Sequence, residues 1–333
     1  MQTHSVNRRR AIAIFAATAG SGVIGAAARP RAAPGFVWSG VAMGSHAQIL
    51  FAGCSEQDAR DAIAMVSAEI ERLEQALSLF RADSQIVRLN RVGTLDAPSA
   101  DLRAALALAL DIAAASDGLY DPTVQALWEA HVDWFGANPD AGLPPDALIA
   151  AARATVDWRR IALSAGAIRL GANQRITLNG LGQGYVTDRV ADLLRQRGFR
   201  HVLVDLGEQR ALGSRPNGAA WSIGRAGGAP IALADGALAT SEGAGCILGA
   251  GGAAHHLFDP RSGRSAAHWR RIIVHHASAA IADALSTTLY AAGPDEIEPL
   301  LGLFPGTSVW ATDREGFERR LAATTHGADF VAR

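Results

Sequence analysis

The sequence contains no lysine, so arginine supplies every permanently charged basic side chain. We interpret this absence as a bias of coding composition, because it indicates no particular chemistry. Aromatic residues make up only 6% of the chain, so the core must consist mainly of Ala, Leu, Val and Ile. The formal net charge of -1 leaves no excess of positive charge to hold nucleic acid or anionic lipid across a broad face. We therefore expect no nucleic-acid partner.

Cysteine is also scarce. Cys54 and Cys246 are the only two in the sequence, and their separation matches no metal-binding pattern. In an oxidising compartment the two thiols are able to form a disulfide, but two separate small residues in the core would explain them equally well. The sequence leaves both interpretations open.

The N-terminal residues have the composition of an export signal. Three adjacent arginines at residues 8–10 precede a mild apolar run that ends in small residues. This pattern favours a twin-arginine-type signal peptide over residues 1–30, followed by a linker over residues 31–36 and one domain over residues 37–333. Such a signal predicts a periplasmic protein with no membrane span in the mature chain. The alternative is an uncleaved membrane anchor, for which the apolar run is barely long enough.

The rest of the chain has the hydrophobicity of a folded protein. Its 333 residues are 49% hydrophobic and 19% charged, which argues against a disordered or fibrous chain and allows one large domain. A strand, a glycine turn, a helix and a strand follow one another only once, so a doubly wound sheet or a barrel is not supported. We predict an α+β fold, a single compact mixed α/β domain with mixed sheets. Helices are expected from residue 55 onward and over residues 101–116, 185–197 and 279–292, and strands over residues 45–52, 176–178, 201–205, 221–224, 271–275 and 308–312.

A glycine-rich segment, residues 179–185, lies between an expected strand and the helix that follows it. Closely spaced glycines let a backbone approach a phosphate, and the amides at a helix start bind its charge. The segment has neither the full dinucleotide fingerprint nor the lysine of a P-loop, so a tight turn explains it equally well.

Two further groups of residues suggest chemistry. Asp283 and Thr287 lie four residues apart in an expected helix, so they share one face. A carboxylate and a hydroxyl there suit a hard cation such as Mg²⁺, although an Asp near a helix start also serves as an N-cap. His255 and His256 precede an Asp-Pro turn, and imidazole is the commonest general base at neutral pH. Residues 117–123 are by themselves typical of a helix end followed by a turn.

Taken in order, these segments resemble the FAD:protein FMN transferase family, also called the ApbE family. The resemblance extends from about Met43 to Gly293 and rests on seven segments in the same order. They are AMGS (42–45), SLFRADSQIVRLN (78–90), DGLYDPTV (117–124), LNGLGQGYVTDRVADLL (178–194), ALATSEG (237–243), HHLFDPRSG (255–263) and ADALSTTLY (282–290).

The resemblance implies that the chain binds FAD and Mg²⁺ and transfers FMN to a Thr or Ser hydroxyl of a target flavoprotein, with release of AMP. It places Asp283, Thr287 and the backbone carbonyl of Gly180 at the metal, and it gives His256 and Asp283 catalytic roles. Seven residues fall at or near positions that contact FAD in the family: Met43, Phe80, Leu119, Tyr120, Asp121, Thr177 and Gln183.

The sequence departs from the family pattern at three places. One glycine is missing from the usual Gly-Gly-acid segment, which here is Gly207-Glu208, and Thr177 and Gln183 stand where charged residues are common. The segment GEQRALG (207–213) and the expected signal resemble the NosX-like branch linked to nitrous oxide reduction, whose target is a membrane-bound flavoprotein. Two alternatives stay open: an FAD pyrophosphatase, in which water replaces the hydroxyl, and a non-catalytic flavin-binding assembly factor.

Overall fold

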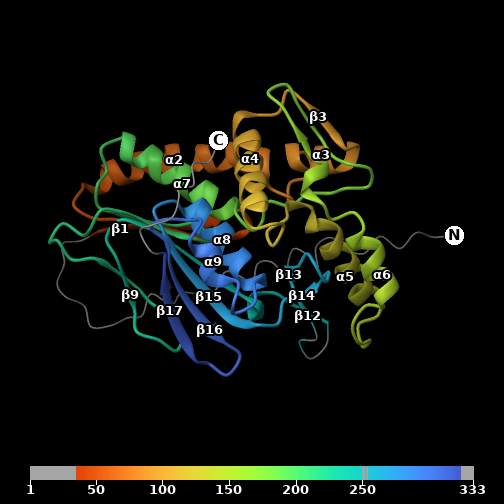
Figure 1. Cartoon of the computed structure of the whole chain (residues 1–333). Helices are drawn as coiled ribbons and strands as arrows, with labels where there is room; N and C mark the ends of the chain where they lie inside the picture. The colour runs from red at the N-terminus through yellow and green to blue at the C-terminus, as the bar shows by residue number, and fades with distance from the viewer. Residues whose placement is uncertain (1–34, 250–251, 253, 324–333) are drawn as a thin grey trace.

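Figure 1 shows a computed structural model of the chain, which describes residues 35–249, 252 and 254–323. The expected signal peptide and most of the expected linker lie outside the described residues, and Phe36 already begins the first strand. Within the described part of the chain, no helix combines the length and the apolar character needed to cross a membrane.

An eight-stranded sheet forms the centre of the fold, and its strands follow one another in chain order. They are β1 (Phe36–Ala42), β2 (Ser45–Phe51), β6 (Val202–Asp205), β7 (Gln209–Leu212), β10 (Gly236–Glu242), β15 (Trp269–His276), β16 (Ser308–Asp313) and β17 (Glu318–Ala322). The α+β class is confirmed, but in place of mixed sheets every strand pairing among the described residues is antiparallel. In the large sheet each strand runs in the direction opposite to its neighbour, so all of its pairings are antiparallel.

Helices cover one face of this sheet (Figure 1). α8 (Ala279–Ala291) packs on β10 and β15 and against α7 (Gly182–Gln196), which in turn contacts α2 (Glu56–Leu77). Further helices are α3 (Gln85–Val92), α4 (Ala100–Ala115), α5 (Gln125–Ala137), α6 (Asp146–Arg153) and α9 (Ile297–Leu301). Short strands complete the described fold: β3 (Thr94–Asp96), β4 (Ala162–Leu163), β5 (Ala167–Arg169), β8 (Trp221–Ile223), β9 (Ile231–Leu233), β11 (Ile247–Leu248), β12 (Ala254–His255), β13 (Phe258–Asp259) and β14 (Arg264–Ser265).

Three hydrophobic cores hold these elements together. The largest lies between the sheet and the helices α2, α4, α7 and α8. A second joins α5 and α6 to β11–β13, which lie together at one side of the sheet in Figure 1. The third lies under the β8–β9 hairpin, on the opposite face of the sheet. Cys246 belongs to the second core and Cys54 packs against the first, and both are free thiols.

Most elements predicted from the sequence are present. The predicted helices correspond to α2, α4, α7 and α8, and Ser55 caps α2 by accepting a hydrogen bond from the Asp58 amide (3.1 Å). The strand predicted over residues 176–178 is wrong. Asn90 Nδ2 donates to Ile176 O and Ile176 N donates to Asn90 Oδ1, both at 2.8 Å, so a side chain replaces the neighbouring strand.

The glycine-rich segment forms a turn over residues 179–181 and continues directly into the first turn of α7, so the tight turn considered from the sequence is present. α7 begins at Gly182, ahead of the start predicted at Tyr185. A Cβ on Gly184 would lie only 2.3 Å from Ala279 O, at the start of α8. Glycine at this position therefore lets the starts of the two helices approach each other closely.

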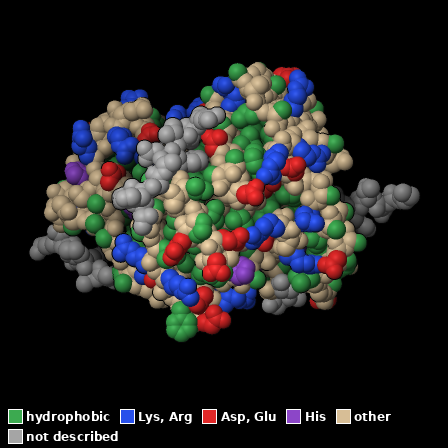
Figure 2. Space-filling view, viewed as in Figure 1, with side chains coloured by type: hydrophobic (Ala, Val, Ile, Leu, Met, Phe, Trp, Pro, Cys, Tyr) green, Lys and Arg blue, Asp and Glu red, His purple; other side chains and the backbone are tan. Residues whose placement is uncertain are grey.

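The surface shows no dominant sign of charge on the face drawn in Figure 2. Acidic and basic side chains are interspersed there, with hydrophobic groups between them. This distribution agrees with the formal net charge of -1. Electrostatic attraction of a partner over that whole face is therefore weak.

Candidate active site

One cavity of about 290 Å³ brings together the residues singled out from the sequence. Its wall includes Tyr120 from the first core, Phe258 from the second and Ile273 from the third, so it lies where the three cores meet. All eleven expected site residues line it: Met43, Phe80, Leu119, Tyr120, Asp121, Thr177, Gly180, Gln183, His256, Asp283 and Thr287. The fold thus gathers segments that are far apart in the sequence, while the role of each residue stays a prediction.

The hairpin between β1 and β2 places Met43 in the cavity wall. Ala42 pairs with Ser45, so the loop consists of Met43 and Gly44, which have positive φ angles of 50° and 78°. Such a two-residue loop is typical of a type I′ turn, and a methionine adopts this conformation at a steric cost. The Met43 amide donates to Glu74 Oε1 (2.7 Å), which fixes the turn beside the cavity.

Asp283 and Thr287 reach the cavity from α8. Asp283 is 5% exposed, and its Oδ2 accepts a hydrogen bond from Gly184 N (3.0 Å) in the first turn of α7. Burial raises the pKa of Asp283 to about 7. Ser278 is the N-cap of α8, so the alternative role of Asp283 as an N-cap is wrong. Gly180 packs closely here, because a Cβ on it would lie 3.2 Å from Thr287 Oγ1.

Glu208 is a second buried carboxylate in this corner, and the sequence singles it out only as part of an altered segment. It lines the cavity, is 6% exposed, and accepts a hydrogen bond from Thr240 N through Oε2 (3.2 Å). Burial raises the pKa of Glu208 well above its usual value, and the negative charges of Asp283 and Asp205 raise it further. Its acidic type after a strand and a glycine was the available signal, but its burial near Asp283 is a property of the folded chain.

The donor set in this corner fits Mg²⁺. Within the described residues neither Asp283 nor Glu208 forms an ion pair with a basic side chain, and two interacting buried carboxylates require a proton or a cation. The Asp283 carboxylate, the Thr287 hydroxyl and the Gly180 carbonyl are oxygen donors, which Mg²⁺ prefers, and Mg²⁺ usually keeps several waters. The described chain contains no cluster of three or more His, Cys, Asp or Glu side chains suited to a metal, so the set does not resemble a zinc site.

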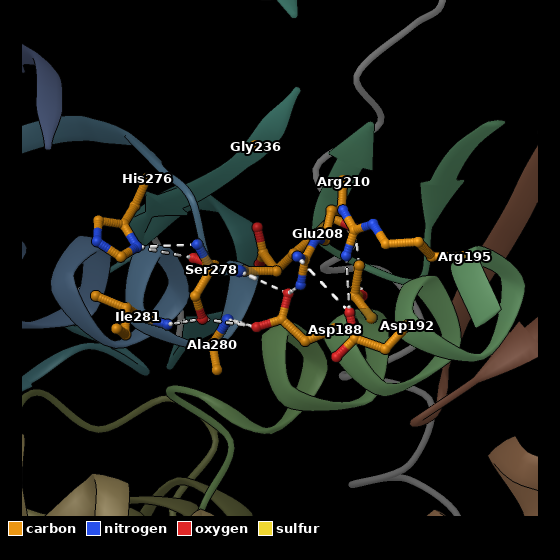
Figure 3. Close-up of polar contacts among 12 residues, drawn as sticks. Asp188, Asp192, Arg195, Glu208, Arg210, Gly236, His276, Ser278, Ala280 and Ile281 are labelled. Carbon is orange, nitrogen blue, oxygen red and sulfur yellow. Dashed lines mark hydrogen bonds and ion pairs between the residues drawn. The ribbon is translucent and has the colours of Figure 1, made fainter. Parts of the chain in front are cut away.

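Asp188 on α7 fixes the start of α8 (Figure 3). Its carboxylate accepts hydrogen bonds from Ser278 Oγ (2.6 Å) and from the first two backbone amides of α8 (2.8 and 3.1 Å), and it pairs with Arg210 of β7. A negative charge at a helix N-terminus also interacts favourably with the helix dipole. Asp283 follows about one turn later, so Asp188 helps to position it without lining the cavity itself.

A family model described as the ApbE family matches residues 43–309. The chain belongs to the ApbE family. A curated relative from Klebsiella pneumoniae named FAD:protein FMN transferase is 26% identical, over 84% of this chain and 85% of its own. The solved structures of the flavinyl transferase ApbE of Pseudomonas stutzeri (apo form) and of the flavin transferase ApbE of Vibrio cholerae have TM-scores of 0.74 and 0.73. Each is 23% identical and matches 88% of this chain, with 95% and 98% of its own chain covered, which confirms the expected fold.

In this ApbE-family chain the two adjacent histidines have different environments. His255 Nδ1 accepts from Leu257 N (3.3 Å), so we assign its proton to Nε2, which donates to Ala266 O (2.9 Å). His256 lines the cavity, and its Nδ1 lies 3.3 Å from Cys246 O, which favours a proton on Nδ1 and an unprotonated Nε2. Burial, and then the neighbouring His255, lower the pKa of His256 to about 4, so its ring is neutral at pH 7.

Asp121 also lines the cavity, but its own chain uses both of its carboxylate oxygens. Oδ1 accepts from Thr123 N (2.8 Å) and Thr123 Oγ1 (2.6 Å), and Oδ2 accepts from Trp158 N (3.1 Å). Burial raises the pKa of Asp121. These bonds hold the family segment 117–124 in place, and its buried Leu119 and Tyr120 supply an apolar wall.

Gln183 occupies the space beside the altered Gly-acid segment. The φ of Gly207 is 109°, a backbone conformation that favours glycine, and a Cβ there would lie 2.6 Å from the Gln183 amide and displace that side chain. Gln183 Nε2 also donates to Ser45 Oγ (2.8 Å) at the start of β2. The backbone of this segment therefore packs closely against Gln183 in the cavity wall, although it contains one glycine where the family usually has two.

Proposed function

We propose that this chain transfers FMN from FAD to a Thr or Ser hydroxyl of a target flavoprotein, with Mg²⁺ as cofactor and AMP as the second product. The observation that carries the proposal is the convergence of all eleven family-pattern residues on one cavity, where the buried carboxylates of Asp283 and Glu208 have no basic partner among the described residues. The curated relatives named FAD:protein FMN transferase support it.

The proposed reaction exchanges one phosphorus–oxygen bond for another. The acceptor oxygen attacks the phosphorus of the FMN half, and the bond from that phosphorus to the bridging oxygen breaks. The AMP half leaves with the electron pair, and the hydroxyl proton passes to a base. Mg²⁺, when held by Asp283, Thr287 and the Gly180 carbonyl, would neutralise diphosphate charge and reduce its repulsion of the incoming oxygen.

His256 is the proposed base. Its ring is neutral at pH 7, and the contact of Nδ1 with Cys246 O leaves Nε2 to accept the hydroxyl proton. Met43 and Phe80 supply apolar contacts for the flavin or adenine ring, and such contacts exclude water from the reacting phosphorus. Exclusion of water favours transfer to the acceptor over hydrolysis of FAD.

The finer parts of the proposal rest on the sequence. The arginines at residues 8–10 support export by the twin-arginine route and a periplasmic location. The resemblance of the segment 207–213 to the NosX-like branch supports a membrane-bound target flavoprotein that takes part in nitrous oxide reduction.

The test uses purified protein with FAD, Mg²⁺ and an apo flavoprotein domain, and it measures the mass gain of FMN on the domain and the release of AMP. Asp283→Asn keeps the side-chain volume but removes the charge, and we expect it to slow transfer about 1000-fold, the upper range for losing one charge-stabilising group. Asp192→Asn, a half-exposed acid on α7, is the control and should transfer at the wild-type rate.

Other outcomes distinguish the alternatives. AMP release that needs no acceptor would identify an FAD pyrophosphatase, and tight FAD binding without AMP release would identify an assembly factor. Full transfer by Asp283→Asn would overturn the assignment of Asp283 to the metal.

A further inference from the structure

Arg271 is a buried cation in the wall of the same cavity. It lies on β15 and is 8% exposed. Its Nη2 donates to Ala226 O (2.7 Å), while its buried Nε has no hydrogen-bond partner among residues 35–249, 252 and 254–323. In the part of the chain that the structure describes, Arg271 takes part in no ion pair, although Glu242 lies directly opposite it on β10.

This state is unusual for an arginine. A guanidinium does not lose its proton in a protein, and a buried charge is costly unless an opposite charge accompanies it. Arg225, the other arginine among the described residues of the cavity wall, is paired with Glu318 of β17. Within the described chain Arg271 forms no ion pair, and the acid opposite it, Glu242, lines the same cavity, so the guanidinium is available to an anionic group of a ligand.

The strand register places Arg271 away from the metal corner. Ile273 pairs with Thr240, whose amide donates a hydrogen bond to the Glu208 carboxylate. Arg271 precedes Ile273 by two residues on β15, so the Cα atoms of these two residues are about 7 Å apart. The cavity wall on this side carries a set of aliphatic side chains. They are Ile223, Ala226, Ile231, Leu238 and Ile273.

We propose that Arg271 binds an acidic side chain of the acceptor protein and thereby helps to select the acceptor. This inference rests on the proposed function. FAD carries its negative charge on its diphosphate, which the proposed function places beside Asp283 and Thr287, so a second anion must come from the second substrate. A carboxylate matches the planar guanidinium through two parallel hydrogen bonds, and the aliphatic wall strengthens such a pair by keeping water away.

The experiment compares Arg271→Gln, Arg271→Lys and the control Arg270→Gln, which removes an exposed arginine from the same strand. For each variant, the FAD dissociation constant is measured by flavin fluorescence, and kcat and the acceptor KM are measured with an apo flavoprotein domain. We expect Arg271→Gln to raise the acceptor KM at least about tenfold, as expected for the loss of a charged hydrogen bond, with the FAD dissociation constant within about twofold of wild type. Arg271→Lys should raise the acceptor KM less, and Arg270→Gln should leave it unchanged.

A double-mutant cycle identifies the partner. Each Asp and Glu near the modified hydroxyl of the acceptor is changed to its amide, and one of these changes should raise KM with the wild-type enzyme but not with Arg271→Gln. An unchanged acceptor KM in folded Arg271→Gln, or a loss of FAD affinity in its place, would overturn the inference and leave the proposed function standing. If Arg271→Gln does not fold, as judged by thermal unfolding, Arg271→Lys decides: a raised acceptor KM supports the inference, and an unchanged acceptor KM overturns it. A wild-type protein that transfers no FMN would refute both.

Discussion

The cavity contains two buried aspartates with contrasting surroundings, Asp121 after α4 and Asp283 on α8. Asp121 accepts three hydrogen bonds from Thr123 and Trp158, which use both of its oxygens. From the described residues Asp283 accepts one, from Gly184 N, although burial raises the pKa of both carboxyl groups. Buried polar groups normally form all their hydrogen bonds within their own chain. Asp121 therefore has the hydrogen bonds of a structural residue, whereas Asp283 keeps acceptor capacity for a ligand.

Glu208 extends this contrast, because it too accepts one hydrogen bond and interacts with the charge of Asp283. Glu208→Gln should slow FMN transfer about 10–100-fold and weaken Mg²⁺ binding by a similar factor, as is usual when a group that supports a metal site is lost. The amide oxygen still accepts from Thr240 N, so the fold is retained. Mg²⁺ titration of the transfer rate is the measurement, and an unchanged Mg²⁺ dependence would separate Glu208 from the metal.

The same variant should change how stability depends on pH in the metal-free protein. The pKa of Asp283 in the folded chain, about 7, lies above the ordinary value near 4, so the folded state binds the proton more tightly. The resulting stabilisation is present below about pH 4 and is lost as pH rises through about 7. Urea unfolding should show this loss in the wild type and a smaller loss in Glu208→Gln, because Glu208, whose own pKa is raised by burial and by Asp283, no longer titrates. Equal slopes in the two proteins would show that the ionisation of Glu208 does not contribute.

Asp188→Asn tests whether the geometry of Asp283 depends on the start of α8. Asp188 and Arg210 are both largely buried, so removal of the Asp188 charge leaves Arg210 without its close partner and should lower the free energy of unfolding by about 3 kcal/mol. At a temperature where the variant is folded, kcat should fall about tenfold while the acceptor KM is unchanged, because a misplaced Asp283 affects the chemical step. The control is Asp192→Asn, one turn further along α7, which pairs closely with Arg195 (3.0 Å) and more distantly with Arg210 (3.8 Å). A loss of stability with an unchanged kcat would show that Asp188 has no positioning role.

The sequence predicts best the features that depend on local order. Helix α2 follows from the N-cap Ser55 and the apolar spacing after it, and the cavity residues follow from family segments that each occupy a short stretch. The strand predicted at residues 176–178 is wrong because the side chain of Asn90, a residue distant in the sequence, forms the two backbone hydrogen bonds that a neighbouring strand would form with Ile176. The environments of Glu208 and Arg271 likewise arise when β7, β10 and β15 come together, and no local pattern contains that information.

Asp121→Asn should have the smallest effect on catalysis. In contrast to Asp283→Asn, which is expected to slow transfer, it should lower the free energy of unfolding and leave the transfer rate nearly unchanged. An amide turns one acceptor oxygen into a donor, which then faces the donors of Thr123 or of Trp158, so the free energy of unfolding should fall by about 1–3 kcal/mol. The transfer rate per folded molecule should stay within about threefold of wild type, since the segment 117–124 contributes wall contacts and no charge to the reaction. Urea unfolding and the transfer assay together measure both quantities. If Asp121→Asn abolished transfer at unchanged stability, Asp121 would act on FAD directly, and hydrogen-bond saturation would not separate the two aspartates.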